Sequence, residues 1–152
     1  QKLENNPWSG AIFAAAGLER INLKPEQHTE LDWMIPAPAQ GAMLVVTMDT
    51  NTSCKAALEP LNHEETAMAV NVEREFLKTL EGGCTAPIGA LATVEDSELK
   101  LKAGLFSLDG TEQYIIEEST PLDHVDGFGK RCAELVLQQG GGQLMKELRK
   151  IL

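Results

Sequence analysis

A cysteine beside paired glycines is the feature of this sequence with the clearest chemical potential. Cys84 lies in the stretch EGGCTAP at residues 81–87. Gly82 and Gly83 let the backbone turn with positive φ and let a ligand come close, while Pro87 stiffens the exit from the turn. A thiol held there can reach outward and attack a strongly electrophilic partner. The spacing leaves a second interpretation open, in which Cys84 is a small buried side chain, the common fate of a free cysteine.

The other cysteines and the histidines predict no further chemistry. Cys132 falls on an apolar helical stripe and Cys54 lies beside a polar stretch, so we interpret both as structural or incidental. No Cys-x-x-Cys pair occurs, which favours a reducing, cytoplasmic compartment. The histidines are far apart and match no metal-ligand spacing, so we predict neither a metal site nor a Cys–His catalytic pair. They are His28, His63 and His124.

The charge balance limits the partners. The sequence has 23 Asp and Glu against 13 Lys and Arg, a net charge of −10, which repels a phosphate backbone and argues against a nucleic-acid partner. An acidic small molecule would need local cations, and Arg20, which follows small residues that we expect to reach a cleft, is one candidate, although such an arginine is more often a surface cation. Four acidic residues look like one solvated helix face rather than paired acid and base carboxylates: Glu64, Glu65, Glu73 and Glu75.

The composition is that of a globular protein. Of the 152 residues, 43% are apolar and 24% charged. No run reaches the roughly 18 apolar residues that a spanning helix needs, so we predict no membrane partner. The length fits one domain, or one domain with part of another. A start at Gln1 instead of Met indicates that residues preceded it.

The first third of the chain predicts strands more than helices. Small apolar residues at 10–16 predict a buried strand that runs into a short helix. Pro36 and Pro38 predict an extended segment, and the continuous apolar run at 42–48 predicts a strand covered on both faces. The polar residues that follow, up to Ser53, read as a linker, so we place a domain boundary there and expect domains at 1–53 and 54–152.

The rest of the chain predicts a small α+β domain. Asn62, with Glu65 three positions later, can cap a helix that ends near Gly82. Its apolar face recurs at helical spacing in Ala69, Val72, Phe76 and Leu80. Three antiparallel strands are expected, around residues 90–94, 99–105 and 113–118, because alternating residues there are separated by turn signals.

Two more helices complete this prediction. Apolar residues at 125–136 share one helical face, and Gly140, Gly141 and Gly142 end that helix before a short last one. A sheet this small can bury only one face well, so we expect about three helices to pack on the leucine side of the second strand. The predicted class is α/β, with an α+β C-terminal domain.

Five blocks of the sequence resemble porphobilinogen deaminase, also called hydroxymethylbilane synthase. The blocks LNHEET at 61–66, EREFL at 73–77 and LEGGCTAPIG at 80–89 resemble the C-terminal domain of that family. Upstream, AAGLER at 15–20 and PAPAQGA at 36–42 are similar to two further blocks in the same order. The Gly-Gly-Cys block is the family's signature, and together the blocks span nearly the whole chain.

The resemblance implies a transferase of tetrapyrrole and haem biosynthesis. The family joins four porphobilinogen units head to tail, with release of ammonia, on a dipyrromethane cofactor. The family's cysteine that Cys84 matches holds this cofactor through a thioether. Gly82 and Gly83, which precede Cys84, are expected to bind the cofactor as well. Arg20 matches an arginine that pairs with carboxylates of the cofactor and growing pyrrole chain. Phe13, Ala14, Gln40 and Gly41 match positions lining the same cleft.

There are also departures from the family pattern. Pro38 and Ala39 stand where the family usually has Val-Gly, Val46 stands where a carboxylate is common, and Gly10 replaces a frequent aspartate. Residues 1–53 match only the end of the second domain and the return strand of the first, so we expect them to be remnants of an incomplete α/β domain pair of the periplasmic-binding-protein type.

The resemblance also implies what this chain lacks. The family's catalytic aspartate and most of its arginines lie N-terminal to the matched part, so we expect no catalytic residue here and no hydroxymethylbilane synthesis by this chain alone. We expect a monomeric, cytoplasmic intact enzyme. Self-association of this chain through unpaired strands stays open. So does the alternative of a non-catalytic binding or interaction module in which Cys84 is unmodified.

Overall fold

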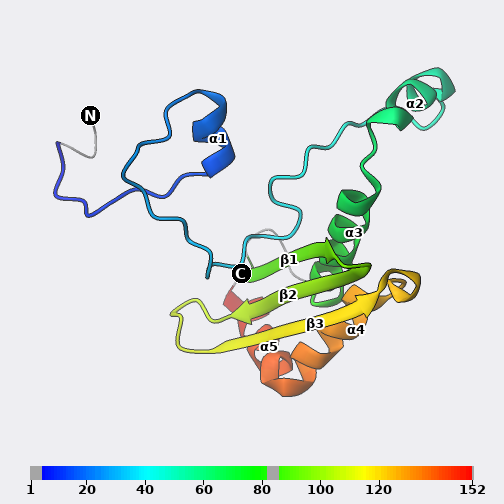
Figure 1. Cartoon of the computed structure of the whole chain (residues 1–152). Helices are drawn as coiled ribbons and strands as arrows, with labels where there is room; N and C mark the ends of the chain where they lie inside the picture. The colour runs from blue at the N-terminus through cyan, green and yellow to red at the C-terminus, as the bar shows by residue number, and fades with distance from the viewer. Residues whose placement is uncertain (1–4, 82–85, 152) are drawn as a thin grey trace. The chain divides into compact units, whose positions relative to one another are not determined.

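The computed structural model describes residues 5–81 and 86–151. Contacts divide the chain into two compact units, Gln1–Trp33 and Met34–Leu152, which we describe separately. Figure 1 shows the order of the elements along the chain. No helix among the described residues is both long and apolar enough to cross a membrane.

The first unit contains one short helix and no strand among its described residues. Helix α1 spans Ala15–Arg20, as expected, but residues 10–14 are irregular and exposed. The predicted strand in this region is therefore wrong. A strand needs a neighbour to bond its backbone N–H and C=O groups, and none of the described residues provides one.

The predicted strand at 42–48 is also wrong. These residues are irregular, and the apolar side chains from Met43 onward are exposed, Met43 by 87% and Val46 by 79%. The predicted linker contributes to a helix, because α2 spans Thr52–Leu58 and the Asn51 side chain caps it by accepting a hydrogen bond from the Cys54 N–H at 3.0 Å. A 3₁₀ turn, η1, follows at Glu59–Leu61. The proposed boundary at residue 53 stays a prediction.

The long helix α3 spans Glu64–Thr79 and confirms the predicted apolar face. Ala69, Val72, Phe76 and Leu80 are all buried. The cap lies one residue later than expected, because the His63 ring nitrogen Nδ1 accepts from the Thr66 N–H at 3.3 Å.

Three antiparallel strands follow in the order β1-β2-β3, as predicted. They span Ile88–Glu95, Glu98–Phe106 and Gln113–Pro121. Ala103 of β2 pairs with Ala90 on one side and Ile116 on the other. The leucines of β2 point into the core: Leu99, Leu101 and Leu105 are at most 1% exposed.

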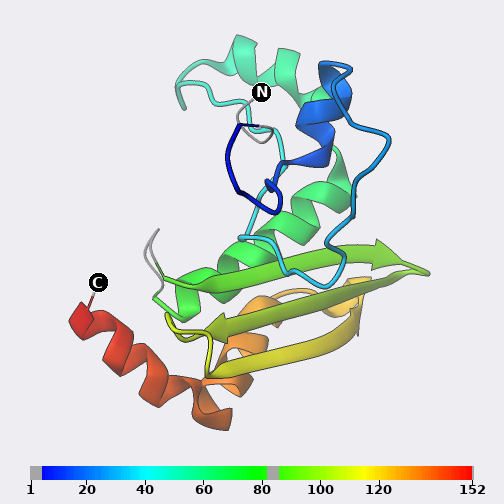
Figure 2. The ribbon, with the colours of Figure 1, turned by 90° about the vertical axis from the view of Figure 1, so that its left-hand side faces the viewer.

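Helices α3 and α4 cover the leucine side of the sheet, and the last helix adds Leu144, Met145 and Leu148 to the same core. The 3₁₀ turn η2 at Leu122–His124 leads to α4 at Phe128–Val136, the π-type turn η3 at Leu137–Gly141 and α5 at Gly142–Ile151. Gly140, at φ 123°, makes the kink that the triple glycine predicted. Figure 2 shows α3 and α4 on the same face of the sheet. The predicted α/β class with a three-stranded antiparallel sheet is confirmed.

Two acidic residues of α3 do not lie on a fully solvated face. Glu73 is 5% exposed, and Glu75 is half-buried, with one carboxylate oxygen that is buried and has no hydrogen-bond partner among the described residues. Glu64 and Glu65 are exposed as expected. The interpretation of a solvated face is therefore wrong for Glu73 and holds only in part for Glu75. Helical spacing places Glu73 next to the apolar stripe, and the partners that make its burial possible come from distant parts of the chain.

Candidate functional site

The predicted attachment residue Cys84 and its neighbours Gly82 and Gly83 lie outside the described residues, but both ends of their segment are described. The chain leaves the core after α3 at Leu80, which is fully buried. Glu81 follows with a left-handed φ of 54°, and its carboxylate forms an ion pair of 2.6 Å with Arg149 in the last turn of α5. This end of the segment is therefore tied to two helices.

The chain returns to the core at the start of β1. Ala86 is partly buried against the hydrophobic core, and the Ile88 N–H donates to the Ala86 carbonyl at 2.8 Å. The Pro87 carbonyl accepts from the Phe106 N–H at 3.0 Å, which joins this end to β2. Residues 82–85 are thus bracketed by two anchored ends in one packed domain.

The other two cysteines differ sharply in their surroundings. Cys132 is 1% exposed on α4, and burial, followed by the nearby Glu118 charge, raises the pKa of its thiol to about 11. A buried thiol with so high a pKa is a poor nucleophile at neutral pH. Cys54 is exposed on α2. Of these two, only Cys54 could compete with Cys84 for a reagent in solution.

Gln40 and Gly41, which the resemblance matches to cleft positions, lie in a tight turn at residues 37–41. The Gln40 N–H donates to the Ala37 carbonyl at 3.1 Å, and the Gln40 side-chain oxygen accepts from the Ala37 N–H at 3.3 Å. Ala39 has φ 62° and Gly41 has φ 89°. The left-handed region suits glycine but costs a residue with a Cβ about 1–3 kcal/mol, so Ala39 keeps this conformation only where its surroundings fix it.

The buried carboxylate of Glu73 supplies that fixing contact. One oxygen accepts from the Ala39 N–H at 2.6 Å and the other from the Ala92 N–H of β1 at 2.7 Å. Glu73 therefore joins the turn, α3 and the sheet. The sequence signals for Glu73 are its helical spacing beside the apolar stripe and its place within a block that resembles the family, and neither indicates these two partners.

The remaining predicted residues lie in the first unit. Ala14 precedes α1, and its carbonyl accepts from the N–H groups of Gly17 and Leu18. Phe13 is 66% exposed. Arg20 is exposed at the last position of α1. Six helical residues span about 9 Å, so Arg20 and the backbone of Ala14 flank one short element.

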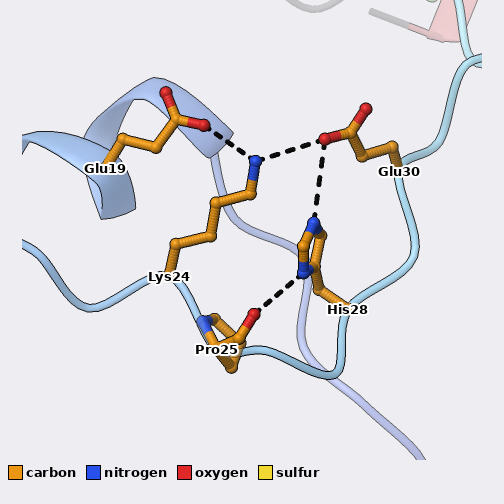
Figure 3. Close-up of polar contacts among 5 residues, drawn as sticks. All are labelled: Glu19, Lys24, Pro25, His28 and Glu30. Carbon is orange, nitrogen blue, oxygen red and sulfur yellow. Dashed lines mark hydrogen bonds and ion pairs between the residues drawn. The ribbon is translucent and has the colours of Figure 1, made fainter.

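A charged cluster holds the loop that follows Arg20, as Figure 3 shows. The Lys24 ammonium bonds Glu19 of α1 at 2.7 Å and Glu30 at 3.2 Å. The hydrogen bonds to these carboxylates raise the pKa of Lys24, and the bond from Lys24 lowers the pKa of Glu30. The His28 ring donates through Nδ1 to the Pro25 carbonyl at 2.8 Å, while Nε2 lies 3.7 Å from Glu30. These contacts tie residues 24–30 back to the helix that carries Arg20.

Family models match both parts of the chain. The model described as "Porphobilinogen deaminase, dipyromethane cofactor binding domain" matches residues 1–56, and the model of the C-terminal domain of porphobilinogen deaminase matches residues 67–138. The chain belongs to the porphobilinogen deaminase family. The match to the C-terminal domain covers most of α3, the whole sheet and α4.

Curated porphobilinogen deaminases align along nearly the whole chain. The protein from Desulfitobacterium hafniense is 34% identical over 151 residues, which cover 98% of this chain and 48% of the relative. Those from a Synechococcus strain and from Geotalea uraniireducens are 35% and 36% identical, and each alignment covers 97% of this chain and 47% of the relative. The chain thus spans about half the length of the curated relatives it matches.

The described residues offer no ready metal site. No group of three or more His, Cys, Asp or Glu side chains that could hold a metal ion occurs among residues 5–81 and 86–151. Among the predicted site residues that the structure describes, Arg20 is the one cation that could meet an acidic ligand.

Proposed function

We propose that this chain is the part of a porphobilinogen deaminase that holds a dipyrromethane cofactor through a thioether at Cys84. The observation that carries the proposal is the pair of anchored ends around residues 82–85, at Glu81 and at Ala86, within a domain that matches the family. A covalent cofactor that serves repeated turnovers needs an attachment point whose flanking chain stays in place.

The chemistry of attachment suits a thiol. Loss of ammonia from porphobilinogen leaves an electrophilic azafulvene, and the Cys84 sulfur forms a bond to its exocyclic carbon while the thiol proton is released. The resulting thioether resists hydrolysis, whereas an ester would not. When bound, the cofactor supplies the electron-rich pyrrole carbon on which the chain of porphobilinogen units is built.

The other predicted residues hold the ligand. Arg20 pairs with acetate and propionate carboxylates, because a guanidinium forms two parallel hydrogen bonds to a carboxylate. The resemblance matches Phe13, Ala14, Gln40 and Gly41 to positions that line the cofactor cleft in the family. Gly82 and Gly83 give the cofactor room next to the backbone.

The activity of the whole enzyme is that of a transferase which condenses four porphobilinogen units into hydroxymethylbilane. We propose that the intact protein is a cytoplasmic monomer, and that this chain alone does not carry out the reaction. The resemblance puts the catalytic aspartate and most of the arginines outside it. The net charge of −10 also opposes a polycarboxylate product in the absence of further cations. Measurable turnover of porphobilinogen by the purified chain would refute this part.

Intact mass spectrometry tests the attachment. The chain is produced in cells that make porphobilinogen, beside Cys84→Ser, Cys54→Ser and Cys132→Ala variants. We expect the mass of one dipyrromethane on the unsubstituted chain and on the Cys54 and Cys132 variants, and none on Cys84→Ser. An adduct that moves with Cys54 would contradict the assignment.

An unmodified mass needs a second step, because cofactor assembly could depend on residues outside this chain. The purified chain is then incubated with preformed hydroxymethylbilane and with porphobilinogen. Absence of any adduct under both conditions favours the alternative of a non-catalytic binding module with a free Cys84.

A further inference from the structure

Strand β1 forms one edge of the sheet (Figure 1). Its N–H groups that point away from β2 need other partners. An exposed strand edge is a template for pairing with other chains, and proteins usually cover it. Here the Ala90 N–H donates to the Pro36 carbonyl at 2.9 Å, and the Ala92 N–H donates to the Glu73 carboxylate at 2.7 Å. The edge is therefore covered by residues that come from two other parts of the chain.

The covering segment lies close against the strand. A Cβ added at Gly89 would lie 2.9 Å from a side-chain carbon of Ile35 and 3.0 Å from the Ile35 carbonyl oxygen. Only glycine fits at this position without displacing Ile35. The segment that leads into the turn at 37–41 is thus held at Gly89, at Ala90 and, through Glu73, at Ala39.

We propose that Glu73 is a positioning residue, which fixes the turn bearing Gln40 and Gly41 on the domain that carries Cys84. The carboxylate satisfies two backbone donors at once, one in the turn and one in the sheet. It also holds Ala39 in a left-handed conformation that the residue would otherwise leave. The proposal rests on the proposed function in one respect, which is that Gln40 and Gly41 face the cofactor.

The chemistry of the contact requires an acidic side chain. An ionised carboxylate accepts through both oxygens, whereas glutamine of the same shape has one accepting oxygen and an NH₂ group that only donates. In a Glu73→Gln variant one of the two N–H groups would therefore face a donor. A buried donor without an acceptor is strongly disfavoured, so that part of the contact should open.

Residue-resolved amide exchange, measured by NMR on the whole chain, tests the contact. We expect Glu73→Gln to speed exchange of the Ala39 or the Ala92 amide roughly tenfold or more, and Glu73→Ala to speed both. Amides between β2 and β3 should exchange as before. Glu65→Gln is the matched control, because Glu65 is exposed on the same helix and the chemical change is identical.

A second readout separates positioning from a purely structural role. The exchange of the Ala37 and Gln40 amides is compared in cofactor-bearing chain and in Cys84→Ser chain. We expect the cofactor to slow the exchange of these two amides at least severalfold. We expect Glu73→Gln to abolish this slowing, while intact mass shows that the variant carries cofactor to the same extent as the unsubstituted chain. Equal exchange with and without cofactor in the unsubstituted chain would contradict the placement of Gln40 and Gly41 beside the cofactor, whereas slowing that persists in Glu73→Gln would refute the positioning role.

The outcomes distinguish the two proposals. Unchanged exchange of Ala39 and Ala92 in both Glu73 variants, relative to Glu65→Gln, would overturn the role of Glu73 whatever happens at Cys84. Faster exchange at these amides without any cofactor on the unsubstituted chain would instead support the contact, while the attachment at Cys84 would fail. Should Glu73→Ala not fold, Glu73→Gln alone decides the matter.

Discussion

Residues 5–62 and residues 63–151 contain similar kinds of apolar residues but differ completely in burial. No described residue before Ala69 is buried, and large side chains such as Ile12, Phe13 and Val46 are more than 60% exposed. After Ala69 a continuous core forms from α3, the three strands, α4 and α5. Apolar composition alone therefore does not produce a core.

The difference lies in where the partners are encoded. In the second region the strands are neighbours in the sequence, β1 and β2 being joined by the two-residue turn Asp96–Ser97, and the helices that cover them directly precede and follow. Each apolar face thus finds its partner nearby. The apolar runs at 10–16 and 42–48 have no such neighbours among the described residues.

The largest expected difference between the two regions is in the free energy of unfolding when an apolar side chain is removed. Phe76→Ala removes a fully buried ring from α3 and should lower the free energy of unfolding by about 3–5 kcal/mol. Val46→Ala, in the exposed run, should change it by less than about 0.5 kcal/mol. Urea unfolding monitored by circular dichroism measures both. A cost of several kcal/mol for Val46→Ala would show that the run is packed in solution.

A pair of glycines gives a smaller contrast of the same kind. A Cβ at Gly129 of α4 would lie 2.2 Å from the Val72 carbonyl oxygen of α3, so Gly129→Ala should push the two helices apart and destabilise the chain by about 1–3 kcal/mol.

The matched control is Gly17→Ala in α1. A Cβ there would meet only the Ala14 side chain, at 4.0 Å. Alanine is favoured over glycine within a helix by about 0.5–1 kcal/mol, so this variant should be neutral or slightly more helical. Thermal unfolding of both variants checks the contrast, which fails if Gly129→Ala melts with the unsubstituted chain.

The smallest expected effect is on acid stability. Hydrogen bonds from Ser107 and Thr111 lower the pKa of Asp109, in the turn between β2 and β3, from 3.8 to about 2. The ionised carboxylate therefore stabilises the folded state above about pH 4, and this contribution is lost as the pH falls from 3.8 towards 2. Asp109→Asn should make unfolding in urea less dependent on pH between 4 and 2.

Glu30 offers the comparison in the first region. The hydrogen bond from Lys24 lowers the pKa of Glu30, so the ionised form of Glu30 is also the one that the folded chain favours. Because no described residue of that region is buried, protonation of Glu30 should leave unfolding of the core unchanged. In Lys24→Met, NMR titration should show the pKa of Glu30 returning towards 4.5. An unchanged value would mean that the contact with Lys24 does not form in solution.

The site could be anticipated from the sequence only in part. The motif around Cys84 and the resemblance to the family could be read from residues 80–89, because a cysteine that follows two glycines is a local sequence pattern. Glu73 could not, because its function depends on Ala39, 34 positions earlier, and on Ala92, 19 positions later. Helical spacing places Glu73 beside the apolar stripe of α3, but it does not show that the carboxylate has partners at Ala39 and Ala92.

The sequence by itself determined the helix with Phe76, the three strands and the glycine kink at Gly140, since periodicity and turn residues act over a few positions. It also predicted strands at 10–16 and 42–48, where it was wrong, because a strand exists only when another strand bonds to it. Only the tertiary structure decided which apolar residues are buried and which carboxylate joins the turn at Ala39 to the edge of β1. Both depend on contacts between residues far apart in the chain, and local sequence patterns do not record such contacts.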